Sequence, residues 1–209
     1  AMCPHTHGAI PQIDFPAVLF ENLVRNNPAP RRLVLTGWGE PLMHPRFFEL
    51  VELANRFWPD TLVRFTTNGI LLNAECRSRL ASVCVSGVTV SVDLWPGRNP
   101  LPPQWRDILH PASPKTFRNL IEYAEDKALS SSTPLTLQCL LVNENLPDVR
   151  EYIRFAAERS MSGVNLVRLQ SYPGHSASRP AWEDEQNTIA ALIRLGRFRL
   201  YTRTPNSRP

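Results

Sequence analysis

Lysine is nearly absent from this chain of 209 residues, which contains only Lys115 and Lys127. The other 21 of its 23 basic residues are arginines, and the 23 basic residues against 19 acidic ones give a formal net charge of +4. Such an excess of positive charge supports non-specific contact with acidic partners and does not identify any one partner. The sequence therefore indicates no specific nucleic-acid site.

Cysteines and long apolar runs are also scarce. The four cysteines (Cys3, Cys76, Cys84 and Cys139) are too few for a disulfide scaffold, which favours a reducing, cytoplasmic location. No run approaches the roughly 18 apolar residues of a membrane span, so we expect no membrane partner. With 43% hydrophobic and 20% charged residues, the composition excludes a wholly disordered chain.

Apolar residues at helical spacing alternate with short apolar runs along most of the chain. Helices are predicted around residues 19–24, 47–58, 74–81, 117–128, 145–156 and 189–193, with Ser113 and Asn145 as caps. Strands are predicted over 32–36, 62–67, 88–92, 135–142, 164–169 and 198–201. This alternation predicts an α/β fold with a parallel sheet.

The predicted helix near residues 19–24 follows a loop and not a strand, so we expect that the first strand of the pattern is missing. No repeat or linker interrupts the alternation before about residue 202. We therefore predict one domain over residues 1–201 and a tail or linker over residues 202–209.

Glycines and polar residues follow the predicted strands, at the edge where strand ends and helix starts meet in such folds. Glycine lets the backbone approach a ligand closely, and a carboxylate such as that of Glu40 suits an ammonium group. Amide, hydroxyl and carboxylate groups suit sugar hydroxyls and ligand carboxylates. The residues at these strand ends are Gly37, Gly39, Glu40, Thr67, Asn68, Ser91, Asp93, Gln138 and Leu169.

Two motifs and this order of strand ends resemble the radical S-adenosylmethionine (radical SAM) enzyme family over nearly the whole chain. Met2-Cys3-Pro4 is similar to the end of the family's C-x3-C-x-Φ-C loop, in which Φ is aromatic or apolar. Gly37-Trp38-Gly39-Glu40-Pro41 is similar to the Gly-Gly-Glu-type motif that follows the family's second strand. The resemblance implies a partial (β/α)6 TIM-type barrel, the radical SAM core, without its first strand.

The resemblance also implies a role for each of these residues. Cys3 would be a ligand of a [4Fe–4S] cluster, with Met2 as the Φ residue, and Glu40 would bind the methionine amino group of SAM. Ribose and methionine carboxylate contacts are implied for Thr67, Asn68, Ser91 and Asp93, and further cofactor contacts for Gly37, Gly39, Gln138 and Leu169. Two of the three expected cluster cysteines are not in the sequence, so we expect this chain alone to be inactive.

The implied chemistry is reductive cleavage of SAM. Three thiolates hold three irons of the cluster, SAM chelates the fourth, and one electron breaks the C5′–S bond. The resulting 5′-deoxyadenosyl radical abstracts hydrogen from a substrate, and a reductant such as flavodoxin or ferredoxin supplies the electron. The two ends of the chain resemble members with a C-terminal cysteine-rich (SPASM-like) domain, which act on peptides or proteins. The sequence assigns no further catalytic residue.

Two other functions stay open. His5-Thr6-His7 resembles the H-x-H motif of metal-dependent amidohydrolase barrels, in which imidazoles bind zinc. The chain also has the pattern of a non-catalytic (β/α) binding domain. Cys76, Cys84 and Cys139 have no ligand spacing with Cys3, and we interpret them as small buried hydrophobes. Binding of SAM would favour the radical SAM hypothesis, and zinc-dependent hydrolysis the amidohydrolase hypothesis.

Overall fold

The computed structural model describes residues 13–37, 39–93, 95, 114–142 and 145–168, together with residues 183, 184, 186, 187 and 190. Its strands form a sheet in the order β1 (Arg32–Leu35), β2 (Leu62–Thr67), β3 (Gly87–Ser91), β4 (Leu135–Leu141) and β5 (Gly163–Arg168). β1 pairs with β2, β2 with β3 and β4 with β5, each in parallel. The predicted α/β class with a parallel sheet is confirmed.

Contacts divide the chain into two compact units. The first unit contains the described residues between 13 and 90 and between 114 and 135, and the second contains all the other described residues. The predicted domain limits, 1–201 and 202–209, stay a prediction. The strand expected at 198–201, and all of the helix expected at 189–193 except the helical Ala190, lie outside the described residues.

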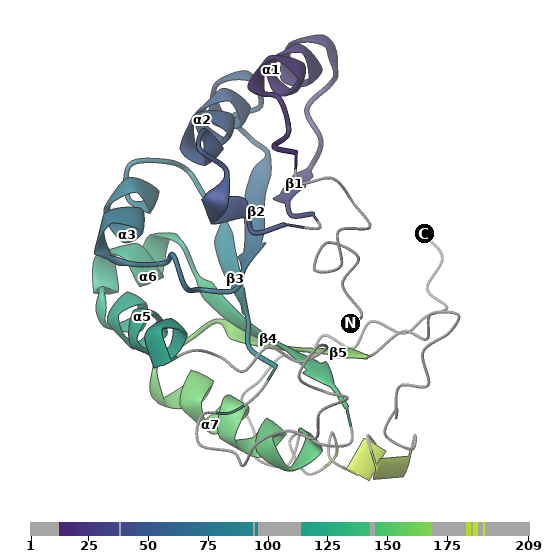
Figure 1. Cartoon of the computed structure of the whole chain (residues 1–209), viewed down its shortest axis with the longest axis vertical. Helices are drawn as coiled ribbons and strands as arrows, with labels where there is room; N and C mark the ends of the chain where they lie inside the picture. Colours follow the sequence, from purple (N-terminus) through teal and green to yellow (C-terminus); the bar gives the residue numbers. More distant parts are fainter. Residues whose placement is uncertain are drawn as a thin grey trace. The chain divides into compact units, whose positions relative to one another are not determined.

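Helices of the first unit pack on one face of its strands (Figure 1). They are α1 (Ala17–Asn26), α2 (Phe47–Phe57), α3 (Ala74–Leu80), α5 (Pro114–Glu125) and α6 (Lys127–Ser132), with a short 3₁₀ turn η1 (Pro41–Met43). The rings of Phe47 in α2 and Phe65 in β2 meet edge-on, with centroids 4.9 Å apart. The apolar helix faces that the sequence predicts are therefore part of the buried core.

One predicted helix is divided in two. The spacing of apolar residues predicts a single helix over 117–128, but α5 ends at Glu125 and α6 starts at Lys127. The reason is Asp126, whose carboxylate accepts the Leu129 N–H at 3.0 Å and so caps the second helix. Ser113, the predicted cap of α5, lies outside the described residues.

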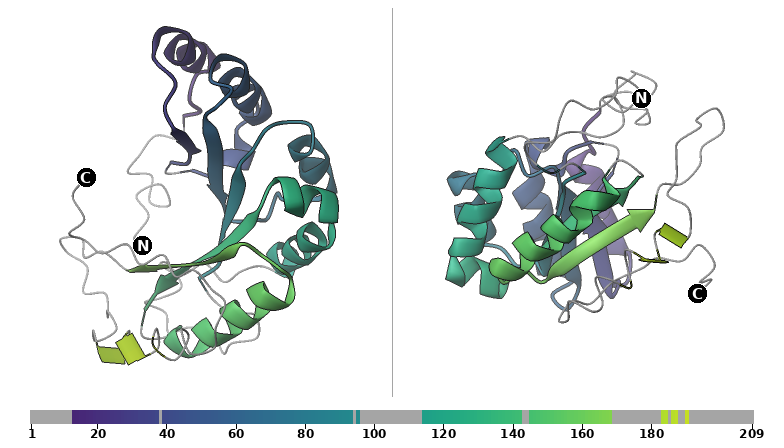
Figure 2. Two further views of the ribbon diagram at one scale, coloured as in Figure 1. Left: turned by 180° about the vertical axis from the view of Figure 1, so that it is seen from behind. Right: turned by 90° about the horizontal axis from the view of Figure 1, so that it is seen from below.

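In the second unit, α7 (Val149–Glu158) packs beside β5, and η2 (Leu146–Asp148) contacts α7 (Figure 2). Trp95 lies edge-on to two rings of α7, with centroids 5.2 Å from Tyr152 and 5.5 Å from Phe155. Asn145 is not the helix cap that the sequence predicts, because its side chain makes no cap hydrogen bond. It binds the ends of the neighbouring strands instead.

Burial alternates along β2 and β4, as in a sheet covered by helices on one face. In β2, Val63, Phe65 and Thr67 are buried, whereas in β4 the half-exposed Gln138 lies between buried Leu137 and Cys139.

No helix in the described part of the chain has the length and apolar character that a membrane crossing needs.

Candidate functional site

The carboxylate of Glu40 is the most densely bonded polar group among the predicted site residues of the first unit. Glu40 follows β1, and its Oε1 accepts the Leu42 N–H at 3.2 Å and the Thr67 hydroxyl at 2.6 Å. Its Oε2 accepts the Asn68 N–H at 2.8 Å. Hydrogen bonds to a charged acceptor are the stronger kind, contributing about 1.5–3 kcal/mol each. The loop after β1 is thereby fixed to the end of β2.

This bonding leaves Glu40 able to accept one further hydrogen bond. An ionised carboxylate offers about four lone-pair positions, and the described contacts occupy three of them. The side chain is half-buried, so a ligand can still reach it. A positively charged N–H donor, such as an ammonium group, matches the one remaining acceptor position.

Thr67 is placed to hold Glu40. The residue is 2% exposed, its hydroxyl proton goes to Glu40, and its oxygen accepts the Gly69 N–H at 3.0 Å. Both contacts are within the protein, so the described geometry gives Thr67 a positioning role. Its predicted direct contact with a cofactor stays a prediction.

Asn68, Gly37 and Gly39 lie at the exposed side of the same loops. The Asn68 side chain accepts the Ile70 N–H at 2.9 Å, which forms a local turn and orients its backbone N–H toward Glu40. At both glycines, no described atom lies within 4 Å of the point where a Cβ would be. Packing within the described chain therefore does not require glycine at either position.

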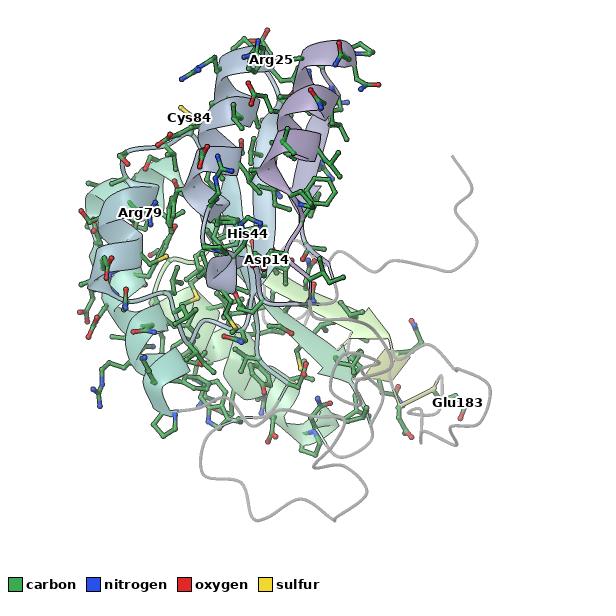
Figure 3. The ribbon with its side chains drawn as sticks, turned by 45° about the horizontal axis from the view of Figure 1, so that its top comes forward. Asp14, Arg25, His44, Arg79, Cys84 and Glu183 are labelled. Atoms are coloured by element: carbon green, nitrogen blue, oxygen red, sulfur yellow. The ribbon has the colours of Figure 1, made fainter. Side chains whose placement is uncertain are left out.

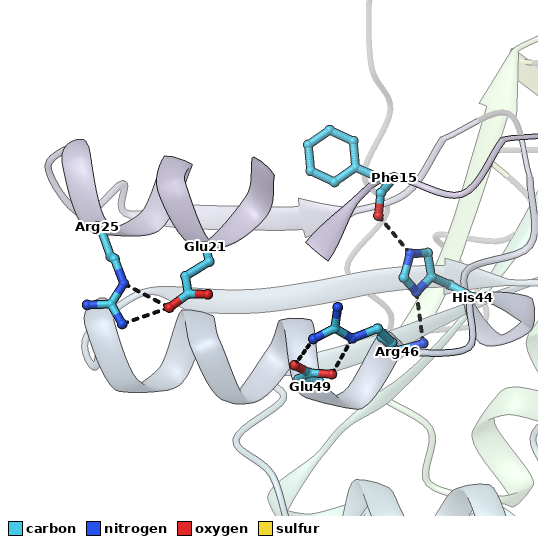
Figure 4. Close-up of polar contacts among 6 residues, drawn as sticks. All are labelled: Phe15, Glu21, Arg25, His44, Arg46 and Glu49. Carbon is cyan, nitrogen blue, oxygen red and sulfur yellow. Dashed lines mark hydrogen bonds and ion pairs between the residues drawn. The ribbon is translucent and has the colours of Figure 1, made fainter. Parts of the chain in front are cut away.

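His44 joins the loop after β1, which contains Glu40, to the residues before α1 (Figure 4). This role was not predicted from the sequence. Its Nδ1 accepts the Arg46 N–H at 3.1 Å, and its Nε2 donates to the Phe15 carbonyl at 2.9 Å. That pair of bonds fits the neutral ring with its proton on Nε2. Phe15 lies two residues before α1, so His44 holds the entry to this helix. The sequence signal available for this role was the position of His44, four residues after Glu40.

The second unit holds the predicted residues Ser91, Asp93 and Gln138. Asp93 Oδ1 accepts the Leu140 N–H at 3.2 Å, and the Gln138 carbonyl accepts the Val92 N–H at 2.8 Å. The side chains of Ser91 and Gln138 are half-exposed. Their predicted cofactor contacts stay predictions.

The cysteines differ from one another. Cys76 and Cys139 are buried as predicted, but the same interpretation is wrong for Cys84, which is exposed (Figure 3) because it lies after α3 and before β3. Burial raises the pKa of Cys76 to about 11 and raises the pKa of Cys139 well above its usual range, so both stay neutral thiols.

Several predicted site residues lie outside the described part of the chain. They are Met2, Cys3, His5, His7 and Leu169. Among the residues that are described, no group of three or more His, Cys, Asp or Glu side chains could hold a metal ion. The predicted cluster and zinc sites are therefore not tested by the described geometry.

Comparison with known proteins identifies relatives of this chain. It is 26% identical over 159 residues to mycofactocin maturase MftC of Mycobacterium ulcerans (strain Agy99), covering 76% of the chain and 39% of that protein. It is 24% identical over 182 residues to the tungsten-containing aldehyde ferredoxin oxidoreductase cofactor-modifying protein of Pyrococcus furiosus. This match covers 85% of the chain and 50% of that protein. The chain thus spans half or less of the length of these relatives. No family model matches it.

Solved structures share its fold. Streptococcus suis SuiB matches with a TM-score of 0.70 and 11% identity, over 93% of this chain and 45% of SuiB. The structure of anSMEcpe with bound AdoMet and the Kp18Cys peptide matches with a TM-score of 0.60 and 17% identity, over 86% and 51%. At this level of identity the likeness concerns the fold alone, and it agrees with the predicted partial TIM-type barrel.

Proposed function

We propose that this chain, whose relatives and structural neighbours are radical S-adenosylmethionine enzymes, is the cofactor-binding core of an enzyme that cleaves SAM reductively. The predicted resemblance to this family is confirmed by these relatives. The chain spans 39% and 50% of the two curated relatives, so the activity of the whole protein is part of the proposal.

The observation that carries the proposal is the fixed carboxylate of Glu40. Three donors from Leu42, Thr67 and Asn68 hold it at the carboxyl ends of β1 and β2, with one acceptor position remaining. A preorganised anion with one free acceptor position suits the α-ammonium group of a methionine moiety. We assign Glu40 this role.

A [4Fe–4S] cluster would be held by Cys3 and two upstream cysteines, with Met2 beside it. When bound, the cluster supplies the electron that splits SAM and yields the 5′-deoxyadenosyl radical. Cys76 and Cys139 are unsuited to join it, because their thiols are buried and stay protonated. Burial therefore gives Cys76 and Cys139 a packing role, and the assignment of Cys3 rests on the resemblance alone.

Three polar residues of the second unit, Ser91, Asp93 and Gln138, stay proposed cofactor contacts. Ser91 and Gln138 carry half-exposed side chains that can bond hydroxyls and carboxylates. Asp93 Oδ1 accepts the Leu140 N–H at 3.2 Å, which fixes the residues that follow β3. Leu169, the last of the predicted contacts, completes this set.

The substrate class that we propose is a peptide or protein. One relative is named a maturase, and two structural neighbours were solved with peptides: SuiB with its precursor peptide SuiA, and anSMEcpe with Kp18Cys. A reductant such as flavodoxin or ferredoxin is the second proposed partner.

Anaerobic reconstitution with iron and sulfide tests the cluster assignment. One thiolate cannot hold three irons, so the 209-residue chain should give no stable [4Fe–4S] absorbance. A gene product that carries the two cysteines expected before Ala1 should form the cluster and release 5′-deoxyadenosine when dithionite is added. Its Cys3→Ser variant should lose both, and Cys84→Ser should keep both. With Cys3 as the third cysteine of C-x3-C-x-Φ-C, the second would stand immediately before Ala1 and the first four residues earlier. A stable cluster in the 209-residue chain, or a gene without cysteines at those two positions, would contradict the assignment.

Zinc distinguishes the amidohydrolase alternative. If His5 and His7 were zinc ligands, the chain should bind one zinc ion tightly and hydrolyse amide substrates only when zinc is present. We expect neither result, and expect SAM binding instead.

A further inference from the structure

Two polar side chains of α5 are buried against the turn that follows β2. Thr116 is 1% exposed and Asn119 is 4% exposed, on the same helix face as buried Phe117 and Leu120. A buried polar group costs free energy unless it is hydrogen-bonded, so its partners are informative. Here the partners are backbone carbonyls of three consecutive residues.

Those carbonyls belong to Asn68, Gly69 and Ile70. The Thr116 hydroxyl donates to the Asn68 carbonyl at 3.1 Å. The Asn119 amide donates to the Gly69 carbonyl at 2.8 Å and to the Ile70 carbonyl at 3.1 Å. The helix therefore fixes every carbonyl of this turn.

The turn is also packed tightly against the helix. Gly69 has φ +76°, and a Cβ there would lie 2.9 Å from Val90 Cγ1 and 3.0 Å from Thr116 Cγ2. Only glycine fits such a position without movement of its neighbours. The turn thus has little freedom to shift away from Thr116.

The opposite side of the same turn holds Glu40. The Asn68 N–H donates to Glu40 Oε2, and the Gly69 N–H donates to the Thr67 hydroxyl that binds Glu40 Oε1. Fixing the 68–70 carbonyls therefore fixes the donors that orient the carboxylate. The connection runs from α5 through one turn to Glu40, entirely within the first unit.

We propose that Thr116 and Asn119 are positioning residues that hold the Glu40 carboxylate in the orientation that binds the ammonium group of SAM. The inference rests on the proposed function of Glu40 and adds to it. Neither residue contacts the ligand; each acts through the 68–70 turn. Their effect should therefore be confined to ligands that carry the ammonium group.

The test uses the complete gene product, reconstituted anaerobically and kept without reductant so that SAM stays intact. Equilibrium dialysis measures the affinity for SAM and for 5′-deoxy-5′-methylthioadenosine, which lacks the amino-acid part. Thr116→Val removes the hydroxyl and keeps the shape, and should weaken SAM binding about fivefold, the loss of one hydrogen bond. Binding of methylthioadenosine should change less than about twofold, and Thr116→Ser should restore SAM binding.

Thr61→Val is the matched control. The Thr61 hydroxyl is also buried and donates to a backbone carbonyl, that of Pro30 at 2.6 Å, but at the other end of β2. It should lower the melting temperature as Thr116→Val does, with SAM affinity unchanged. Asn119→Ala should resemble Thr116→Val, with a larger loss because it removes two bonds.

Two further results separate the possible failures. In a Glu40→Gln background, Thr116→Val should have no additional effect on SAM affinity, because the group it positions is gone. Hydrogen exchange at the Asn68 N–H should be faster in Thr116→Val than in the parent. The positioning role would be overturned if Thr116→Val weakened SAM and methylthioadenosine binding equally, or weakened SAM binding just as much in the Glu40→Gln background. It would also be overturned if the exchange rate at the Asn68 N–H did not change. A parent protein that binds SAM no better than methylthioadenosine would contradict the proposed function of Glu40 instead.

Discussion

Asn145 donates its side-chain N–H to the Asp93 carbonyl at 2.9 Å, and so joins the loop after β4 to the residues after β3. The same amide donates to the Leu140 carbonyl at 2.5 Å, and its oxygen accepts the Val142 N–H at 3.0 Å. Asn145 is completely buried, at 0% exposure. Its side chain therefore replaces backbone bonds at a point where the strands end.

Replacing Asn145 by alanine should destabilise the protein strongly. The change removes the partner of one buried N–H and of two part-buried carbonyls, and a buried polar group left unpaired costs about 1–3 kcal/mol. We expect a loss of about 2–4 kcal/mol in the free energy of urea unfolding. Asn26→Ala is the control, because Asn26 bonds one carbonyl at an exposed helix end, and should cost less than about 0.5 kcal/mol. Equal costs for the two changes would mean that the Asn145 bonds contribute nothing.

Gly69→Ala should be costly for a different reason. The new Cβ would lie 2.9 Å from Val90 and 3.0 Å from Thr116, at a backbone φ of +76°. We expect a loss of at least about 1–3 kcal/mol in unfolding free energy. Gly163→Ala meets no atom within 4 Å and should change stability by about 0.5 kcal/mol or less. A Gly69→Ala protein as stable as Gly163→Ala would show that the turn is not tightly packed.

Cysteine labelling should follow burial. In native protein at pH 8, iodoacetamide should modify Cys84, which is exposed, well before Cys76 and Cys139, which are buried. Adding urea should make all three react at similar rates. Peptide mass mapping at successive times measures each site separately. Rapid native labelling of Cys76 or Cys139 would contradict the described packing.

Alkaline pH should weaken the fold through Cys76. Burial raises its pKa from 9.0 to about 11, so the folded state keeps a proton that the unfolded state releases. This stabilising contribution is present below pH 9 and is lost as pH rises toward 11. Unfolding free energy should therefore fall more steeply between pH 9 and 10.5 in the parent than in Cys76→Ala. If unfolding free energy fell in parallel with pH in the two proteins, a raised pKa of Cys76 would be ruled out.

Most of the fold could be predicted because apolar spacing records which faces are buried. The expected strands at 32–36 and 62–67 match β1 and β2, and the helix expected at 47–58 matches α2. The break at Asp126 was missed because an aspartate within an apolar pattern is read as a solvated helix residue. Its cap bond to Leu129 outweighs that pattern.

The candidate site could be predicted only in part. Glu40, Thr67 and Asn68 were found from their places after strands, and the structure brings the three together. Thr116 and Asn119 were missed, because a polar residue on a helix gives no sign of whether it is buried. His44 was missed because its partner, the Phe15 carbonyl, is 29 residues away and is a backbone atom.

The most direct test of the central claim is SAM binding by Glu40→Gln, measured by equilibrium dialysis with the complete gene product reconstituted and unreduced. Loss of the charge should weaken SAM binding at least about tenfold, while methylthioadenosine binding stays within about twofold. Glu52→Gln, the same change at an exposed position of α2, should bind SAM as the parent does. Equal SAM affinity in Glu40→Gln and the parent would contradict the claim that Glu40 binds the ammonium group.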